Sequence, residues 1–188
     1  MSKIKLIIGV GNPDEEYKGT RHNVGFMLID LIAKKAVGEF ELNKNLDSLV
    51  AKCRLNGSSI VLAKPQTYVN KTGLAAVKLK NFYKVRPGQM LVIQDDLDIP
   101  FGNIKLSFDK NSGGHKGIES IMKALKTKKF YRLRVGLATK PLQKARQQSD
   151  KKRDEFVMKF VLSKFTPSEQ DQLKKSFKTA LERLSQIN

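Results

Sequence analysis

The chain has 188 residues, of which 40% are hydrophobic, and this size and composition fit one globular domain with a sizeable core. Its single cysteine, Cys53, excludes an internal disulfide and a cysteine-based metal cluster, and its apolar runs are far shorter than the ~20 residues that a membrane-spanning helix needs. Lysine and arginine number 36 against 18 acidic residues, and the formal net charge of +18 indicates a polyanionic partner, with nucleic acid as the first candidate and an acidic membrane surface as the second.

The cysteine usage and the N-terminal segment also bear on where the protein works. One unpaired cysteine is typical of a reducing compartment, and the first predicted strand begins by Ile4, which leaves no room for a signal peptide. No long basic helix with a broad apolar face stands out at the N-terminus, and this disfavours the membrane as a partner. We therefore expect a cytoplasmic protein.

The first predicted elements flank a histidine. Residues 6–10 are a continuous β-branched and aliphatic run that predicts a buried strand, and Gly11 ends it. Apolar residues resume with helical spacing at Val24, so His22 lies just before a helix N-terminus. The unpaired amides and the macrodipole of a helix start favour neutral imidazole, which is the form that can accept a proton. His22 is therefore a candidate general base, with a capping or loop histidine as the alternative.

Polar residues collect at this strand exit and at the next one. Asn12 and Tyr17 share the connection that carries His22, at the carboxyl end of a strand, where open α/β sheets place their ligands. Tyr68 and Asn70 follow the second strand of a predicted hairpin. The elements expected here are a loop over residues 34–45, strands over 49–54 and 59–63 with an Asn56-Gly57 turn, and a helix over 72–83.

A third strand exit carries a carboxylate. Residues 90–94 predict a buried strand that runs directly into Asp95, and residues 104–108 alternate as a half-exposed strand. Residues 111–117 form a glycine loop before a helix over 118–125. The exposed amides of such a loop can hold a phosphate or a carboxylate, although a plain tight turn is equally consistent with the motif.

The C-terminal third is rich in cations. Apolar alternation over residues 133–137 predicts the last strand, and residues 120–135 contain six lysines or arginines and no acid. Residues 140–154 are polar and lack apolar periodicity, so we expect a mobile loop or lid there. A final helix is expected after Thr166, because a proline and an early acid follow it. No internal repeat or domain boundary interrupts the pattern, so residues 1–188 are expected to form one domain.

These units predict a fold and a composite site. The fold class is α/β, a single-domain three-layer sandwich with a mixed twisted sheet and helices on both faces. Asp95 can hold one ring N–H of His22, fix its tautomer and leave the other nitrogen free to deprotonate water. The amides of Asn12 and Asn70 can donate to a carbonyl or a developing oxyanion and can accept from a substrate N–H.

Other chemistries fit the sequence less well. No G-x-S-x-G motif supplies a serine nucleophile, and two histidines with one cysteine make a poor ligand set, so no metal is expected. The glycines of residues 9–14 depart from the dinucleotide-binding pattern, because an aspartate stands where the third glycine belongs, so no cofactor is expected either. Attack of water on an activated ester is the economical prediction.

Separated motifs along residues 4–169 follow a common order. They read Gly-Asn-Pro with Thr-Arg-His-Asn-Val-Gly, then Lys-Pro-Gln-Thr-Tyr-Val-Asn, Asp-Asp-Leu-Asp-Ile-Pro-Phe-Gly, Gly-Gly-His-Lys-Gly and Arg-Leu-Arg-Val-Gly. In sequence and order they closely resemble the bacterial peptidyl-tRNA hydrolase family. The resemblance covers nearly the whole chain and is specific, because distant motifs agree.

The resemblance implies a monomeric α/β enzyme whose partner is peptidyl-tRNA. Such an enzyme hydrolyses the ester that joins a peptide, or an N-blocked amino acid, to the 3′-terminal ribose of tRNA, and so recycles tRNA from peptidyl-tRNA released by stalled ribosomes. On that pattern His22 is the catalytic base, Asp95 is its partner, and Asn12 distinguishes blocked from free aminoacyl groups. The other implied contacts to substrate or tRNA are Tyr17, Tyr68, Asn70, His115, Lys116, Lys105 and Arg134.

One position departs from the family pattern. The residue after His115 is commonly asparagine in the family, and here it is Lys116. A lysine cannot accept a hydrogen bond, so a two-way amide contact is lost there, and a phosphate contact can take its place. Two alternatives stay open: a non-catalytic RNA-binding relative of the same fold, which would not need His22 and Asp95, and a small-molecule esterase, which would not explain the charge.

Overall fold

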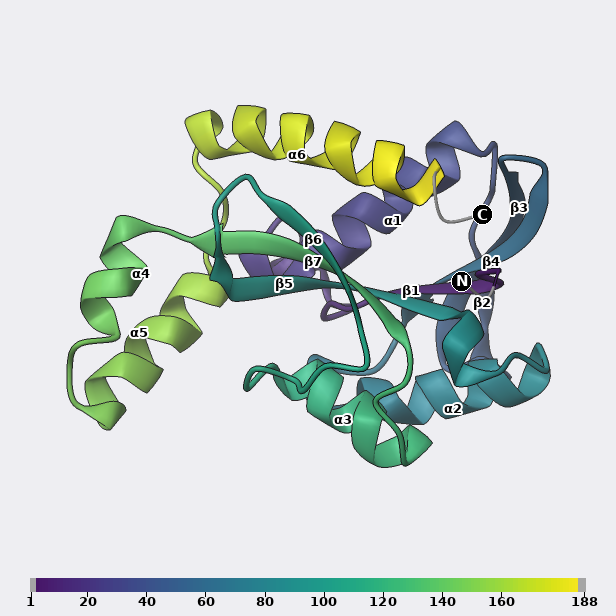
Figure 1. Cartoon of the computed structure of the whole chain (residues 1–188), viewed down its shortest axis with the longest axis horizontal. Helices are drawn as coiled ribbons and strands as arrows, with labels where there is room; N and C mark the ends of the chain where they lie inside the picture. The colour runs from purple at the N-terminus through teal and green to yellow at the C-terminus, as the bar shows by residue number, and fades with distance from the viewer. Residues whose placement is uncertain (1–2, 186–188) are drawn as a thin grey trace.

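The protein is built around one mixed sheet. The computed structural model describes residues 3–185, in which a seven-stranded sheet has the order β2-β3-β4-β1-β5-β7-β6 (Figure 1). The pairings of β4 with β1, β1 with β5 and β5 with β7 are parallel, and the remaining three are antiparallel. The strands are β1 (Leu6–Gly9), β2 (Glu41–Asn43), β3 (Ser48–Leu55), β4 (Ser58–Pro65), β5 (Met90–Pro100), β6 (Ile104–Phe108) and β7 (Tyr131–Ala138).

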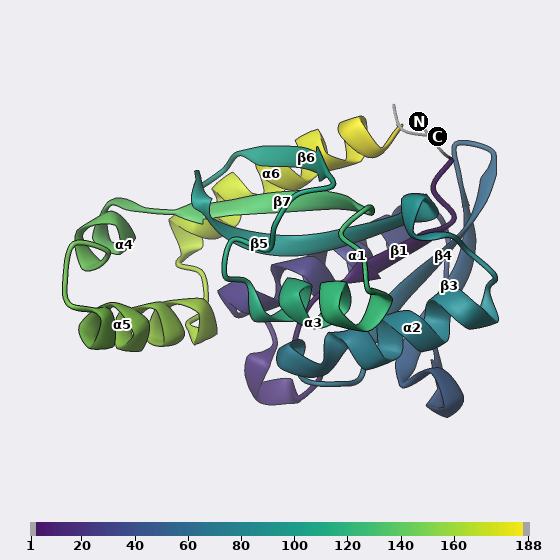
Figure 2. The ribbon, with the colours of Figure 1, turned by 60° about the horizontal axis from the view of Figure 1, so that its bottom comes forward.

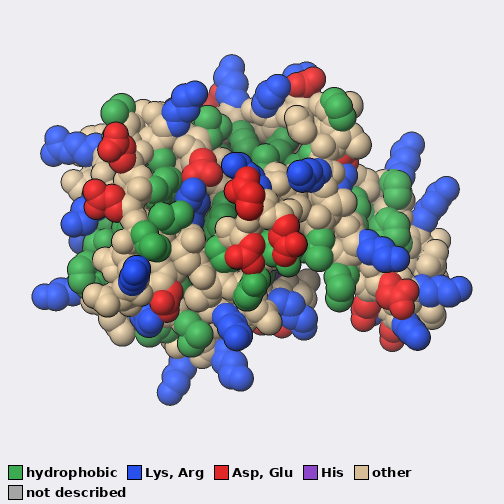
Figure 3. All heavy atoms as spheres, turned by 180° about the vertical axis from the view of Figure 1, so that it is seen from behind, with side chains coloured by type: hydrophobic (Ala, Val, Ile, Leu, Met, Phe, Trp, Pro, Cys, Tyr) green, Lys and Arg blue, Asp and Glu red, His purple; other side chains and the backbone are tan. Residues whose placement is uncertain are grey.

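Helices cover both faces of this sheet. Helices α1 and α6 lie on one face and α2 and α3 on the other, so the predicted three-layer α/β sandwich is confirmed (Figures 1 and 2). Helices α4 and α5 form an arm that projects from the body beyond the end of β7 and stands apart at the right of Figure 3. The helices are α1 (Val24–Lys35), α2 (Thr72–Phe82), α3 (Lys116–Leu125), α4 (Lys140–Ala145), α5 (Asp150–Leu162) and α6 (Pro167–Ser185).

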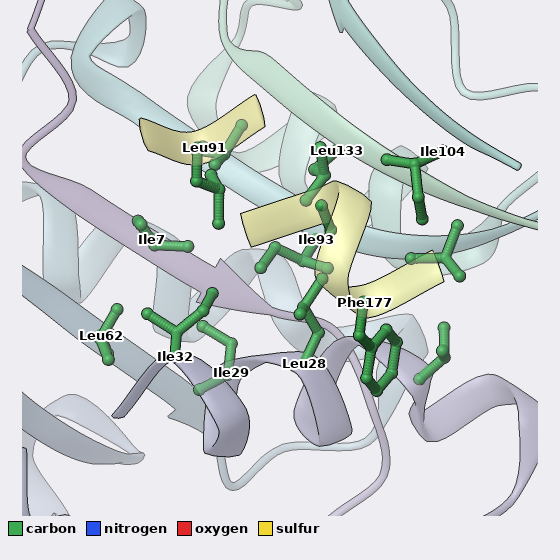
Figure 4. Close-up of a cluster of buried hydrophobic side chains, with 14 of the residues drawn as sticks. Ile7, Leu28, Ile29, Ile32, Leu62, Leu91, Ile93, Ile104, Leu133 and Phe177 are labelled. Carbon is green, nitrogen blue, oxygen red and sulfur yellow. The ribbon is translucent and has the colours of Figure 1, made fainter. Parts of the chain in front are cut away.

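Two apolar clusters, one on each face of the sheet, hold the layers together. On one face Leu28 and Ile32 of α1 and Phe177 of α6 pack over Ile7 and Ile93 of the central strands (Figure 4). On the other face the side chains of α2 and α3 pack over the alternate residues of the same strands. Strand β1 is buried along its whole length, because both faces are covered and both edges are paired, and this explains its uninterrupted apolar run.

The structure confirms the helices expected to begin near residues 24, 72 and 167 and the strands expected over residues 49–54 and 59–63. Three other expectations were wrong. Strand β5 runs on to Pro100, so Asp95 lies inside the strand, because pairing with β7 continues past it. Residues 140–154 are largely helical, since α4 and the start of α5 occupy them, and the apolar stripe of α5 lies mostly beyond residue 154. The loop over residues 34–45 contains the short edge strand β2, whose first two residues are exposed and show no alternation.

No helix within residues 3–185 has the length and apolar content needed to cross a membrane.

Candidate active site

The turn that carries His22 is held against the sheet by a glycine. Residues Arg21–Asn23 form a 3-10 turn immediately before α1, as expected for a helix start. A Cβ atom on Gly25 would lie 2.4 Å from the backbone oxygen of Val10 and 2.6 Å from that of Ile93. Only glycine lets the first turn of α1 approach β1 and β5 this closely, and this approach brings His22 over β5.

The same turn is anchored to the C-terminal part of the chain. The buried Arg21 guanidinium donates to both carboxylate oxygens of Glu169 at 2.8 and 2.7 Å, and it lies 4.5 Å from the ring centre of Phe160. These contacts tie the segment before His22 to the end of α5 and the start of α6.

Two imidazoles meet on one carboxylate oxygen. His22 Nδ1 lies 2.8 Å and His115 Nε2 3.0 Å from Oδ1 of Asp95, whose side chain is almost fully buried. His115 Nδ1 accepts hydrogen bonds from the backbone amides of Gly117 and Ile118 at 3.1 and 3.4 Å, so its proton sits on Nε2 and is donated to Asp95. An ionised Asp95 only accepts, so His22 also donates from Nδ1 and keeps Nε2 free.

The charges of the three groups favour this arrangement. Burial acts to raise the pKa of Asp95, but attraction and hydrogen bonds from His22 and His115 outweigh it and hold the pKa of Asp95 well below its usual range. Burial acts to lower the pKa of His22, whereas Asp95 raises it through its charge and hydrogen bond, and the net result is a pKa of His22 above its ordinary value of 6.5. The expected preference of the helix start for neutral imidazole is therefore outweighed by the carboxylate.

His22, Asp95 and His115 each have a side-chain atom that could bind a metal ion, and these three atoms lie within 4.8 Å of one another, which is close enough for one ion. Their mutual hydrogen bonds account for the geometry, because one oxygen serves two N–H donors. The arrangement suits a histidine that accepts a proton from water at Nε2 while the carboxylate steadies its other nitrogen.

Asn12 is fixed beside this group by a residue that the sequence reasoning missed. Asn23 accepts a hydrogen bond from the backbone N–H of Asn12 and donates one to its carbonyl oxygen, each at 2.9 Å. The side-chain oxygen of Asn12 accepts from the backbone N–H of Val69 at 2.9 Å. The Nδ2 group of Asn12 is thus the part of this amide best able to donate to a ligand. Asn23 lies within the Thr-Arg-His-Asn motif, which was the available signal.

Two cavities meet at His22. A cavity of about 180 Å³ lies between the arm and the glycine loop, and a second, more open hollow adjoins it at His22 and Lys116. Lys116 lines both, and its Nζ donates to Glu119 at 3.3 Å. The first cavity is lined by His22, Asp95, Leu97, His115, Arg146, Val157 and Val161, and the second by Asn12, His22, Tyr68, Asn70 and Lys71.

The structure therefore brings seven of the predicted site residues together around these two cavities, namely Asn12, His22, Tyr68, Asn70, Asp95, His115 and Lys116. The other three predicted contacts, Tyr17, Lys105 and Arg134, do not line either cavity. Tyr17 belongs to the 3-10 turn Glu15–Tyr17. Lys105 is exposed on β6 opposite Arg134 of β7, and the Arg134 side chain is paired with Asp96 at 2.7 Å. Sequence reasoning also missed Val157 and Val161, because α5 was not predicted.

Comparison with known proteins gives a consistent result. Residues 6–188 match the family model described as peptidyl-tRNA hydrolase. The chain is 44% identical over 180 residues to a peptidyl-tRNA hydrolase of Aquifex aeolicus (strain VF5), covering 95% of this chain and 86% of the relative. It is 42% identical over 166 residues to that of Sulfurihydrogenibium sp. (strain YO3AOP1), covering 88% and 81%. The crystal structure of peptidyl-tRNA hydrolase from Acinetobacter baumannii superposes with a TM-score of 0.88 at 30% identity, covering 100% of this chain and 89% of that one.

Proposed function

Because this chain belongs to the peptidyl-tRNA hydrolase family, we propose that His22 and Asp95 are the groups with which it hydrolyses the ester between a peptidyl group and tRNA. The reaction is hydrolysis of a carboxylic ester, and the products are a free peptide acid and deacylated tRNA. The observation that carries the residue assignment is the 2.8 Å contact between His22 and Asp95 at the point where two cavities meet.

The first step is the activation of water. The Nδ1–H group of His22 donates a hydrogen bond to Asp95 and keeps its proton. The Nε2 atom therefore carries a lone pair that can take a proton from a water molecule. The water oxygen forms a bond to the ester carbonyl carbon, and the carbonyl oxygen gains negative charge. His22 becomes an imidazolium, which the buried carboxylate of Asp95 stabilises.

The second step is the departure of the ribose. The bond between the carbonyl carbon and the ribose oxygen breaks, and the imidazolium of His22 returns its proton to that oxygen. The Nδ2 group of Asn12 lies on the second cavity beside His22 and can donate to the charged oxygen of the intermediate. The ammonium group of Lys116, which lines the same cavity, would contact a phosphate of the substrate. His115 acts as a positioning residue, because its Nε2 group hydrogen-bonds the same oxygen of Asp95 as His22 does.

The two cavities suit the two halves of the substrate. The cavity beside Val157 and Val161 has an apolar wall from the arm, which fits side chains of the peptide. The hollow beside Tyr68 and Asn70 is open and lined mostly by residues with polar groups, which fits the terminal ribose and base. The arm then acts as the lid expected over residues 140–154. Lys105 on the edge strand β6 and Arg134 on the neighbouring strand β7 would contact tRNA phosphates.

The protein is proposed to act as a monomer in the cytoplasm, with peptidyl-tRNA as its partner. Each chain supplies a complete set of the groups named above, and a free pool of peptidyl-tRNA exists where translation takes place.

The decisive experiment measures the release of N-acetylated amino acid from N-acetyl-aminoacyl-tRNA by the wild type and by His22→Ala. We expect the variant to lose roughly 10²–10⁴-fold in kcat with little change in KM, because it lacks the proton acceptor. A non-catalytic RNA-binding relative would release nothing in either form. Wild-type turnover by His22→Ala would reject His22 as the base.

A further inference from the structure

Besides the two cavities at His22, the molecule has a groove at the opposite end of the sheet. It is formed where β1 and β4 begin, whereas Asn12 and Tyr68 follow the other ends of these strands. The chain from Val61 to Pro65 alone spans about 13 Å at ~3.3 Å per residue, so the groove is separate from the catalytic cavities. Its cavity volume is about 620 Å³, within the ~300–1,000 Å³ of typical ligand pockets.

The floor and one wall of this groove are apolar. Val61 of β4 and the buried Val85 form the floor. Tyr83, the residue that follows α2, stands at the wall with its ring half-buried. Helix α2 ends at Phe82, so it leaves this part of the sheet uncovered. A flat, partly apolar group can therefore lie against the strand and the phenol ring.

Three cations and no acid line the same groove. Lys52 and Arg54 are opposite Val61 and Ser59 in the antiparallel pairing of β3 with β4, so their side chains share one face of the sheet. Lys5, just before β1, adds a third positive charge. Within residues 3–185, none of the three side chains has a hydrogen bond or an ion pair to the protein. Their mutual repulsion is relieved when an anion binds between them.

The adjoining hollow limits where an anion can bind. It shares Lys52 and Tyr83 with the groove, but Glu39 and Glu41 line it, and its exposed Phe82 is apolar. Carboxylates there repel a phosphate, so the anionic part of a ligand is confined to the end formed by the three cations. The groove thus presents a cationic end beside an aromatic and aliphatic surface.

We propose that this groove binds one nucleotide unit of a single-stranded RNA segment, with its phosphate on Lys5, Lys52 and Arg54 and its base against Val61, Tyr83 and Val85. Phosphate next to a flat base matches both halves of the groove, whereas a lone phosphate would leave the apolar floor unused. This second RNA contact does not depend on the hydrolytic mechanism, because none of its residues belongs to the catalytic cavities.

The test is a methyl NMR titration of the full-length protein with a 5′-phosphorylated single-stranded RNA pentanucleotide at low salt. The methyl groups of Val61 and Val85 report on the groove, and those of Val157 and Val161 report on the catalytic cavity. We expect the groove methyls to shift. The double variant Lys52→Gln/Arg54→Gln is expected to weaken the binding reported by those methyls by about tenfold or more, because two phosphate contacts are lost.

The matched control is Lys175→Gln/Lys178→Gln, which removes the same charge from the exposed side of α6. We expect it to bind at the groove within about twofold of the wild type, and both double variants to retain hydrolysis of N-acetyl-aminoacyl-tRNA. Equal losses in the two variants, or no shift at the groove methyls, would overturn the proposal. So would equally tight binding of AMP at the groove, which would indicate a free-nucleotide site, or displacement of the RNA there by a short polyglutamate peptide.

Discussion

At the scale of single residues, Asp95 sets the chemistry by accepting two hydrogen bonds on one oxygen. His115 is held as a donor by two backbone amides, so it shares the charge of Asp95 with His22. This second contact helps to keep the carboxylate ionised and in place. His22, Asp95 and His115 therefore form one hydrogen-bonded unit, to which we assign the catalysis.

Lys116 is the residue at which this chain departs from the family pattern, and its exchange for asparagine tests its role. It lines both cavities and is exposed, with its ammonium group weakly paired to Glu119. We expect Lys116→Asn to raise KM several-fold at low salt and to lower the salt dependence of binding by roughly one phosphate contact, with kcat nearly unchanged.

Steady-state kinetics on N-acetyl-aminoacyl-tRNA at several salt concentrations measures both effects. Lys178→Asn on α6 removes the same charge and serves as the control. A large loss of kcat at constant KM would instead assign Lys116 to the chemical step.

The sequence predicted the pairing of His22 with Asp95 but not the surroundings of this pair. His22 could be predicted because helical spacing after a strand exit places it at a helix start, and Asp95 because it follows a buried run. The contacts of His115 and Asn23 depend on the paths of two loops, which local patterns do not specify. The pKa direction of His22 also depends on a partner 73 positions away in the sequence.

At the scale of secondary structure elements, the close packing of α1 on the sheet positions the site. Gly25 is the residue that permits it, and its replacement by alanine is a direct test. The added Cβ would meet backbone oxygens of Val10 and Ile93, so α1 must move away from β1 and β5. We expect Gly25→Ala to cost about 1–3 kcal/mol of stability and to lower kcat, because His22 shifts relative to Asp95.

Thermal unfolding and the hydrolysis assay measure the two effects together. Gly88→Ala is the matched control, because a Cβ there meets nothing within 4 Å. Equal behaviour of the two variants would show that the contact at α1 does not constrain the site.

The elements also show which sequence signals were informative. Capping residues and apolar periodicity predicted α1, α2 and α6, and the Asn-Gly turn predicted the hairpin of β3 and β4. The arm was missed because α4 buries only Leu142 and Ala145, and no residue of α5 is buried. A helix with so little buried surface has a weak periodic signal.

At the scale of the whole molecule, the strand order gathers distant segments. The parallel strands β4, β1, β5 and β7 have their carboxyl ends at one side of the molecule, so the connections that carry Asn12 and Tyr68 meet there beside the last part of β5 (Figure 2). Many lysine and arginine side chains project from the rim of the face seen in Figure 3, and acidic side chains lie near its middle, at its left and on the arm. The composition predicted the sign of the charge, but its distribution required the fold.

The net charge of +18 predicts how tRNA binding responds to salt. We expect the affinity for deacylated tRNA to fall by roughly tenfold or more between 50 and 200 mM monovalent salt, because each phosphate contact releases a counterion. Fluorescence anisotropy with labelled tRNA measures this dependence. An affinity that does not change with salt would contradict a binding surface built on charge.

The central claim is that Asp95 raises the pKa of His22 and holds it in the tautomer that activates water. The most direct test is the pH dependence of kcat/KM for the wild type and for Asp95→Asn. In the wild type, activity should rise with pH through a midpoint above 6.5, because His22 must lose its proton and its pKa is raised. In Asp95→Asn, no carboxylate charge opposes the effect of burial, which lowers the pKa of His22. The midpoint of the pH profile should therefore move below the wild-type value, and the maximal kcat/KM should fall roughly 10²–10⁴-fold. A midpoint that stays in place or moves upward in Asp95→Asn would contradict the account.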